Sequence, residues 1–435
     1  KGIALNRALK ENLFTLFFGI TNKIPVIIVG KPGCSKSLSV QLLYQAMKGE
    51  SSENKLFRYY PRIILTSFQW SKTSTSQGIE FVFDKAKKIV IGEKGKEKII
   101  SLVYFDELGL AELSKNNPLK ALHKLLEYDE MKKDEQVAFV GISNWVLDAS
   151  KMNRGLFLSI IDPDEKDLEE TANTIADSYR DNLSGDNPTL FKGLADTYYY
   201  YKDYLTENKS NNKDFHGSRD FYHMIKLAAR ITINQPNATD PWKPCLERNF
   251  GGLKDVMKII KEIYSKHAID KNKIEQPSNE YKLMECIIDN TNDPKSRYLL
   301  VISKSSLSPF LISNLLDSQT IQKEYLFLQG SKFSGDCEKD IYAAEILNKI
   351  QKCMEEGKLL MLQDFDFIYP SLYDLFNQNF TVVGGKNFAR IALGKSNNAM
   401  SYVHDNFRCI VLVEAEEIDK QDSPFLNRFE KHILS

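Results

Sequence analysis

The segment Gly30–Ser37, which reads Gly-Lys-Pro-Gly-Cys-Ser-Lys-Ser, combines residue types that can bind the phosphate groups of a nucleotide. Gly30 and Gly33 let the backbone curl so that consecutive N–H groups point at phosphate oxygens. The Lys36 ammonium would reach the β- and γ-phosphates, and the Ser37 hydroxyl would coordinate Mg²⁺. We therefore predict a site for ATP and Mg²⁺, with nucleotide contacts along Gly30, Lys31, Pro32, Gly33, Cys34, Ser35, Lys36, Ser37 and Leu38.

The residues around this segment bear on whether it is a phosphate-binding loop or an ordinary glycine turn. An apolar run at 25–29 is typical of a buried strand, and residues 38–44 are typical of the first turns of a helix. Phosphate-binding loops occur between such a strand and helix, because the helix N-terminus adds free N–H groups. Ser35 departs from the usual pattern, since it stands where the last glycine is expected. The flanking elements favour the phosphate site over the turn.

An acidic pair follows a second strand-like run at 98–105. Asp106 would hold Mg²⁺ through water, and Glu107 would polarise the water that attacks the γ-phosphate. Two solvated acids at a strand end are the alternative. The position of the pair, a domain-sized distance after the phosphate loop, favours the catalytic interpretation.

A third strand-like run at 136–142 ends at Ser143 and Asn144. The Asn144 amide could hold the γ-phosphate and the attacking water. Ligands of parallel α/β sheets bind outside the carboxyl ends of the strands. The sequence therefore predicts one site at the edge where these three strands end.

Composition limits the classes of protein to consider. The chain has 435 residues, enough for two or three domains, and 58 basic residues balance 58 acidic ones, which gives no support for nucleic acid as the main partner. No apolar run approaches the roughly 20 residues that span a bilayer. Six cysteines are scattered without C-x-x-C spacing, so we expect reduced thiols, no zinc site and a cytoplasmic location. The chain begins at Lys1 without a signal peptide, and we interpret it as a piece of a longer protein.

The order of apolar patterns predicts two modules of one fold. Residues 1–24 are typical of a helix, 25–160 alternate strands and helices in the manner of a parallel α/β sheet, and 165–275 show only helical patterns. Strand-like runs at 298–305, 358–364 and 407–413 then repeat the earlier order.

The repeat differs from the first module in its chemistry. It lacks the glycine loop, and Gln363-Asp364 replaces the acidic pair. We predict an α/β large subdomain at 1–160, a helical lid at 161–277 and a degenerate, truncated second module at 278–435. Two unrelated α/β domains are the alternative.

Several segments together carry a resemblance to a known family. They are residues 3–9, 30–38, 74–79, 104–112, 141–145, 215–220, 248–252, 371–378 and 424–432. The chain resembles the mysterin family, giant RING-finger ubiquitin ligases with a dynein-like AAA+ motor core, along nearly its whole length. The resemblance implies two tandem AAA+ modules, the second without nucleotide motifs, and places the RING and the ubiquitin-transfer machinery outside this segment.

The resemblance also implies roles for single residues. Asn144 matches the sensor-1 residue, and Arg219 matches the sensor-2 arginine that contacts the γ-phosphate. Arg428 matches an arginine finger, supplied by the second module to the Gly30–Ser37 site, and Arg154 would serve a preceding module in the same way. Surface salt-bridge arginines are the alternative for all three.

We therefore expect an ATP-hydrolysing AAA+ segment whose partners are neighbouring modules of the same longer chain, with ubiquitin machinery reached through other regions. The alternative is a nucleotide-binding switch or scaffold with little turnover, which Ser35 and the degenerate second module favour. Asp106-Glu107, Asn144 and Arg428 favour hydrolysis. A GTPase is disfavoured, because no Asn-Lys-x-Asp motif follows the phosphate loop.

Overall fold

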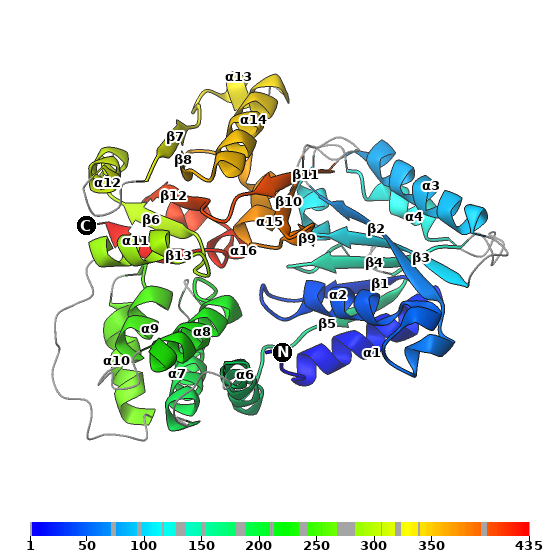
Figure 1. The fold of residues 1–435 in the computed structure, drawn as a ribbon, viewed down its shortest axis with the longest axis horizontal. Helices are drawn as coiled ribbons and strands as arrows, with labels where there is room; N and C mark the ends of the chain where they lie inside the picture. Colours follow the sequence, from blue (N-terminus) through cyan, green and yellow to red (C-terminus); the bar gives the residue numbers. More distant parts are fainter. Residues whose placement is uncertain are drawn as a thin grey trace. The chain divides into compact units, whose positions relative to one another are not determined.

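The computed structural model shows two compact units (Figure 1). The first unit comprises Leu5–Asp162 with Ile391–Ala399, and the second comprises Lys1–Ala4, Pro163–Arg390 and Met400–Ser435. The structure describes residues 2–70, 75–93, 98–114, 117–127, 136–148, 153–179, 188–208, 210, 213–234, 242–253, 255–267, 283–305, 307–317, 323–337, 340–392 and 398–434.

The first unit is built on a parallel sheet with the strand order β2-β3-β4-β1-β5. The strands are β1 (Val26–Val29), β2 (Arg62–Gln69), β3 (Ile99–Asp106), β4 (Ala138–Ser143) and β5 (Leu156–Ser159). The helices are α1 (Arg7–Thr21), α2 (Lys36–Ala46), α3 (Ser76–Gly92) and α4 (Lys120–Leu125). The predicted strands and the predicted N-terminal helix are therefore present.

The two faces of this sheet bury different side chains. Aliphatic residues such as Val26 and Ile28 pack with Leu16 of α1 and Val40 of α2 on one face. Phe105 belongs to an aromatic group on the other face, which also includes Phe68, Trp70, Phe83 and Phe139. Successive side chains of a strand point to opposite faces, so the continuous apolar runs of these strands fill both cores.

The second unit begins with a helical region, which we call the lid. It contains α6 (Glu165–Asp177), α7 (Pro188–Glu207), α8 (Ser218–Asn234), α9 (Trp242–Asn249) and α10 (Val256–His267). These helices share one core, in which Tyr198 stacks on Phe221 with the ring centroids 5.0 Å apart. The lid forms one compact unit with the second sheet, although it follows the first sheet in sequence.

The second unit continues with a parallel sheet of the order β13-β6-β12-β8-β7. The strands are β6 (Leu299–Ser303), β7 (Tyr325–Gln329), β8 (Leu359–Gln363), β12 (Arg408–Glu414) and β13 (Glu430–Leu434). The flanking helices are α11 (Leu283–Asn292), α12 (Ser308–Leu316), α13 (Ser334–Cys337), α14 (Asp340–Glu356), α15 (Tyr373–Phe376) and α16 (Ser423–Leu426). A three-stranded sheet of β9 (Thr381–Val383), β10 (Lys386–Ala392) and β11 (Asn398–Val403) lies between β8 and β12 in sequence.

The two five-stranded sheets share one topology. Numbered along the chain, the strands of each sheet follow the order 2-3-4-1-5, as a repeated module requires. The strand register shows which residues of the two modules are equivalent. Asp106 pairs with the last residue of β2, and Gln363 pairs with the last residue of β7. The next residue has a left-handed backbone in both modules, with φ of 56° at Glu107 and 62° at Asp364. Asp364 therefore occupies the position equivalent to Glu107.

Close backbone approach joins the lid to the second sheet. A Cβ atom on Gly251 would lie 2.5 Å from the Lys431 carbonyl oxygen, and one on Gly252 would lie 2.9 Å from the Lys431 Cβ. A Cβ atom on Gly217 would collide with the side-chain amide of Asn427. The lid can approach β13 and the residue after α16 this closely because these three positions are glycine.

Buried charges lie at the same contact between the lid and the second sheet, which we call the joint. Asp220 of α8 accepts hydrogen bonds from Arg297 (2.8 Å) and Lys431 (2.9 Å), and all three side chains are buried. Arg248 of α9 donates two hydrogen bonds of 2.9 Å to the Glu430 carboxylate. Removal of one partner from such a pair leaves an uncompensated buried charge and costs roughly 3–5 kcal/mol.

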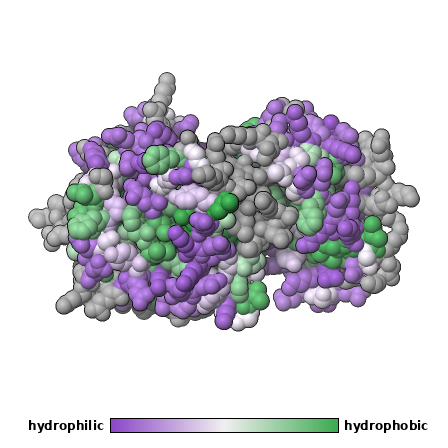
Figure 2. All heavy atoms as spheres, turned by 90° about the horizontal axis from the view of Figure 1, so that it is seen from above, coloured by the Kyte–Doolittle hydropathy of each residue, from purple (hydrophilic) through white to green (hydrophobic). Residues whose placement is uncertain are grey.

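The surface visible in Figure 2 is mostly polar, with smaller apolar groups between the polar ones. Among the described residues, no helix is long and apolar enough to cross a membrane.

The buried carboxylates of the joint predict a loss of stability in acid. Burial raises the pKa of Glu430, but the Arg248 charge and hydrogen bonds from His432 and Arg248 outweigh it and lower the pKa well below its usual value. The pKa of Asp220 is also lowered, because Lys431 and Arg297 outweigh its burial. Carboxyl groups with lowered pKa values stabilise the fold above their unfolded pKa, and this contribution is lost as pH falls toward the folded pKa.

We expect the unfolding free energy of the second unit to fall between pH 5 and pH 3 by roughly 2 kcal/mol through Glu430 and roughly 1 kcal/mol through Asp220, because an aspartate has the lower unfolded pKa. Urea titrations at both pH values measure this. Glu430→Gln should lower stability at pH 5 and reduce the difference between the two pH values. Glu417→Gln is the control, because Glu417 forms an exposed pair with Lys420. Equal pH dependence in the wild type and Glu430→Gln would contradict the assignment.

Candidate nucleotide-binding site

The loop between β1 and α2 needs glycine at two positions. A Cβ atom on Gly30 would lie 2.8 Å from the Cys34 Sγ and 3.0 Å from the Ile160 Cβ, and Gly33 has a φ of 91°. The Gly30 N–H donates to the Ser143 carbonyl (3.2 Å), which fixes the start of the loop to the end of β4. The loop is therefore compact enough to surround an anion with backbone N–H groups.

Ser35, which stands where the motif usually has glycine, has a left-handed backbone, the conformation that favours glycine. It has φ 63° and ψ 17° and immediately precedes α2, whose first residue is Lys36. An L-residue pays a steric penalty of roughly 1–2 kcal/mol in this region. The backbone at Ser35 is therefore one that the glycine of the usual motif would adopt without this penalty.

Lys36 points back into its own loop. Its ammonium donates to the carbonyl oxygens of Gly30 (2.5 Å) and Lys31 (2.9 Å), and its side chain is buried. A phosphate bound here would replace these carbonyls as the acceptor. Pro32 is also buried, whereas Ser37 and Leu38 are partly exposed in the first turn of α2.

Two residues outside the motif support the loop. Asn12 of α1 donates to the Cys34 carbonyl (3.3 Å). Lys31 forms an ion pair of 2.7 Å with Asp162, and both side chains are about half exposed. The sequence analysis missed Asn12 and Asp162, because no motif spacing links them to the loop.

Glu107 and Asn144 meet at the edge of the sheet where β3 and β4 end. The Asn144 amide donates to the Glu107 carboxylate (2.5 Å), and the Glu107 N–H donates to the Asp106 carboxylate (3.0 Å). Asp106 is buried. A Cβ atom on Gly109 would lie 2.5 Å from the Trp145 ring, so this glycine allows the segment after the acids to pack on Trp145.

The strand order explains why these groups come together. β4 lies between β1 and β3, and all three strands are parallel. Their carboxyl ends therefore place Gly30–Ser37, the Asp106-Glu107 pair and Asn144 on the same edge of the first sheet. The donor set fits Mg-nucleotide, with N–H groups and an ammonium for phosphate and carboxylate and hydroxyl oxygens for Mg²⁺.

The three arginines that the resemblance singled out make contacts within their own units. Arg219, in the first turn of α8, donates to the Asn377 side chain. Arg154 pairs with Glu127. The roles predicted for Arg219 and Arg154 stay predictions.

Arg428 lies in the interior of the second unit. Its side chain is 2 % exposed, its guanidinium carbon lies 3.5 Å from the centre of the Tyr373 ring, and it donates to the Pro424 carbonyl. The sequence analysis expected this side chain to reach a γ-phosphate. In this position it presents no cation on the surface of its unit, so a finger role requires that it leave Tyr373. The role stays a prediction.

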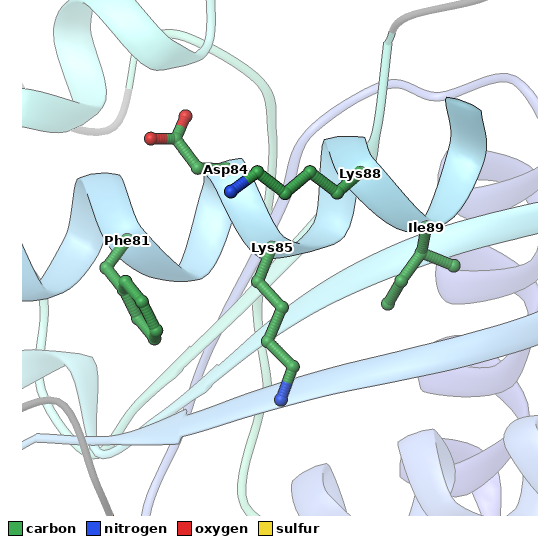
Figure 3. Close-up of a pocket in the computed structure, with 5 residues that line it drawn as sticks. All are labelled: Phe81, Asp84, Lys85, Lys88 and Ile89. Atoms are coloured by element: carbon green, nitrogen blue, oxygen red, sulfur yellow. The ribbon is translucent and has the colours of Figure 1, made fainter. Parts of the chain in front are cut away.

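A pocket of about 370 Å³ lies on α3 and is lined by Phe81, Asp84, Lys85, Lys88 and Ile89 (Figure 3). Phe81, Lys85 and Ile89 extend from the same side of the helix, as their spacing requires. None of the lining residues belongs to the predicted nucleotide site. Within the described part of the chain, no group of three or more His, Cys, Asp or Glu side chains is arranged to hold a metal ion.

Comparison with known proteins identifies the family. Two models, both described as an RNF213 AAA domain, match residues 2–167 and 288–435. The chain belongs to the RNF213 (mysterin) family. This confirms the resemblance seen in the sequence, and the two parallel sheets agree with tandem AAA modules.

Relatives of the RNF213 family match this chain along almost its whole length. It is 37% identical to the human E3 ubiquitin-protein ligase RNF213 over 100% of the chain, and 36% identical to the mouse protein over 99%. It is 35% identical to the zebrafish E3 ubiquitin-protein ligase rnf213-beta over 99% of the chain. The chain spans 8% of the length of each of these relatives.

The left-handed backbone of Ser35 predicts that Ser35→Gly stabilises the first unit. We expect a gain of about 1 kcal/mol in unfolding free energy, because glycine removes the Cβ clash of this conformation. Urea unfolding measures it. Ser37→Gly is the control and should destabilise by about 0.5 kcal/mol, since Ser37 lies in the first turn of α2 and serine is a better helix former than glycine. A loss of stability in Ser35→Gly would contradict the prediction.

Proposed function

We propose that the Gly30–Ser37 loop binds ATP with Mg²⁺ and that the first module hydrolyses it, as an AAA+ motor segment of a longer RNF213-like ubiquitin ligase. The observation that carries the proposal is the convergence of the buried Lys36, the Asp106-Glu107 pair and Asn144 at one edge of the first sheet. Lys36 and the loop would bind the phosphates, Ser37 and Asp106 would hold Mg²⁺, and Glu107 would orient the attacking water.

The second module supports a single nucleotide site. Only residues 304–307 separate β6 from α12, whereas 30–35 separate β1 from α2. The acid equivalent to Glu107 lies beside an exposed lysine of its own module, because Lys332 lies 3.6 Å from the Asp364 carboxylate and 3.2 Å from that of Glu414. Because the connection is short and the acids lie beside a lysine, the second module is a poor site for nucleotide phosphates.

A switch or scaffold with little turnover is the second candidate. It is favoured by the contacts of the two main groups of the site, since Lys36 bonds to carbonyls of its own loop and Glu107 to Asn144. Both contacts must break before Lys36 can bind phosphate and Glu107 can orient water.

In the hydrolytic proposal, Arg428 would leave Tyr373 and offset negative charge in the transition state. Arg428→Ala should then slow ATP turnover and leave the affinity for ADP unchanged.

The proposal includes a cytoplasmic location and partners among the neighbouring modules of the longer chain. Ubiquitin transfer, which the names of the relatives indicate for those proteins, would lie in other regions. The described cysteines are consistent with a reducing compartment, because Cys34, Cys245, Cys286, Cys353 and Cys409 form no disulfide.

Lys36→Ala should abolish ATP binding, because the cation and donor to the β- and γ-phosphates are lost. Titration calorimetry with ATP and Mg²⁺ should give one site in the wild type and none in Lys36→Ala. Lys304→Ala is the matched control, because Lys304 follows the strand equivalent to β1 in the second module. A stoichiometry of two, or unchanged binding in Lys36→Ala, would overturn the single-site proposal.

Glu107→Gln separates binding from hydrolysis. The amide keeps the shape of the side chain but accepts no proton, so ATP should still bind while turnover falls about 100-fold or more. Phosphate release under saturating ATP measures turnover, and Glu112→Gln, six residues past Asp106, is the matched control. Turnover unchanged by Glu107→Gln would remove Glu107 from the mechanism. No turnover in the unmutated full-length protein would support the switch instead.

A further inference from the structure

The phosphate loop carries a second lysine, whose ammonium has no part in the mechanism so far. Lys31 follows Gly30, at a position where the phosphate-loop motif allows any residue. Its ammonium forms an ion pair of 2.7 Å with Asp162, and the two side chains are 49% and 60% exposed. An exposed ion pair of this kind contributes little to the stability of a fold. Lys31 can therefore exchange this partner for another at little cost.

The Lys31 backbone borders the place where the β- and γ-phosphates would bind. The Lys36 ammonium, which would contact these phosphates, lies 2.9 Å from the Lys31 carbonyl oxygen and 2.5 Å from that of Gly30. A phosphate that replaces these carbonyls as the acceptor therefore lies next to Lys31. The flexible four-carbon stem of a lysine lets its ammonium turn toward an acceptor so close to its own backbone.

The start of the loop lies on the side of the catalytic groups. The Gly30 N–H donates to the carbonyl of Ser143, the residue before Asn144, over 3.2 Å. Asn144 contacts Glu107, which would orient the water that attacks the γ-phosphate. Lys31, the residue after Gly30, is therefore at the γ-phosphate end of the loop.

Asp162 lies beside the same end of the loop, because the chain after β5 runs along it. β5 pairs with β1, and a Cβ atom on Gly30 would lie 3.0 Å from the Cβ of Ile160, the residue after β5. Asp162 follows two residues later, outside helices and strands. Its carboxylate would repel a triphosphate bound to the loop, since both are negatively charged. Bound ATP therefore favours separation of Asp162 from Lys31.

We propose that Lys31 exchanges the Asp162 carboxylate for the γ-phosphate when ATP binds, and that it thereby distinguishes ATP from ADP. The inference rests on the proposed nucleotide site and adds to it the side chain that reads the third phosphate. A terminal phosphate offers three acceptor oxygens and about two negative charges, so it is a stronger partner for an ammonium than one carboxylate. ADP has no such group, and Lys31 keeps Asp162 as its partner.

The test compares the affinities of the chain for ATP and ADP, measured by titration calorimetry with Mg²⁺. Lys31→Met keeps an apolar stem and removes the charge, so the affinity for ATP should fall about 10-fold and the affinity for ADP less than about 2-fold. Lys88→Met is the matched control and should keep both affinities. It removes an exposed lysine of the same unit from α3, which contacts β2 and β3.

Asp162→Asn tests the exchange of partners. It removes the competitor of the γ-phosphate, so the affinity for ATP should rise about 3-fold while the affinity for ADP changes little. Urea unfolding of Lys31→Met and Asp162→Asn should match the wild type, because the ion pair is half exposed.

Two results would overturn the inference and leave the nucleotide site standing. One is a ratio of ATP to ADP affinity that Lys31→Met leaves unchanged, either because both affinities stay or because both fall equally. The other is a lower affinity for ATP in Asp162→Asn. Absence of ATP binding in the wild type would overturn the proposed function and this inference together.

Discussion

All five strands run in the same direction in each of the two sheets, and the site depends on this constraint. Because β4 lies between β1 and β3, the carboxyl ends of these strands bring together groups that are far apart in sequence. The contact between Glu107 and Asn144 joins the ends of β3 and β4, and the hydrogen bond from Gly30 to Ser143 joins the start of the loop to β4. A change of strand order would separate the phosphate loop from the acids.

The same backbone carries different chemistry in the two modules. Glu107 and Asp364 share a position and a left-handed backbone, yet one bonds to an amide and the other faces Lys332. The fold depends on the apolar strands, which both modules keep. The chemistry depends on a few residues at strand ends, which can change without loss of the sheet.

Charge burial makes the joint between the lid and the second sheet specific. Asp220, Arg297 and Lys431 are removed from water together, and their mutual hydrogen bonds offset part of the cost. A lid displaced from β13 would leave these charges buried without partners or exposed at the cost of the packing around Gly251 and Gly252. The lid and the second sheet therefore form one compact unit, although the lid follows the first sheet in sequence.

The sequence by itself determined three strands of each five-stranded sheet, the helical region, the repeat and the family, because apolar runs and the Gly30–Ser37 spacing are local signals. The strands β2, β5, β7 and β13 were not predicted. The sequence also singled out Glu107 and Asn144, since each follows an apolar strand. Only the tertiary structure decided that Arg428 is buried against Tyr373 and that Asp220 pairs with Lys431, 211 residues away. Local pattern reports residue type and periodicity, whereas such contacts depend on the path of the whole chain, and an arginine near a surface motif has the same sequence signature as one in a core.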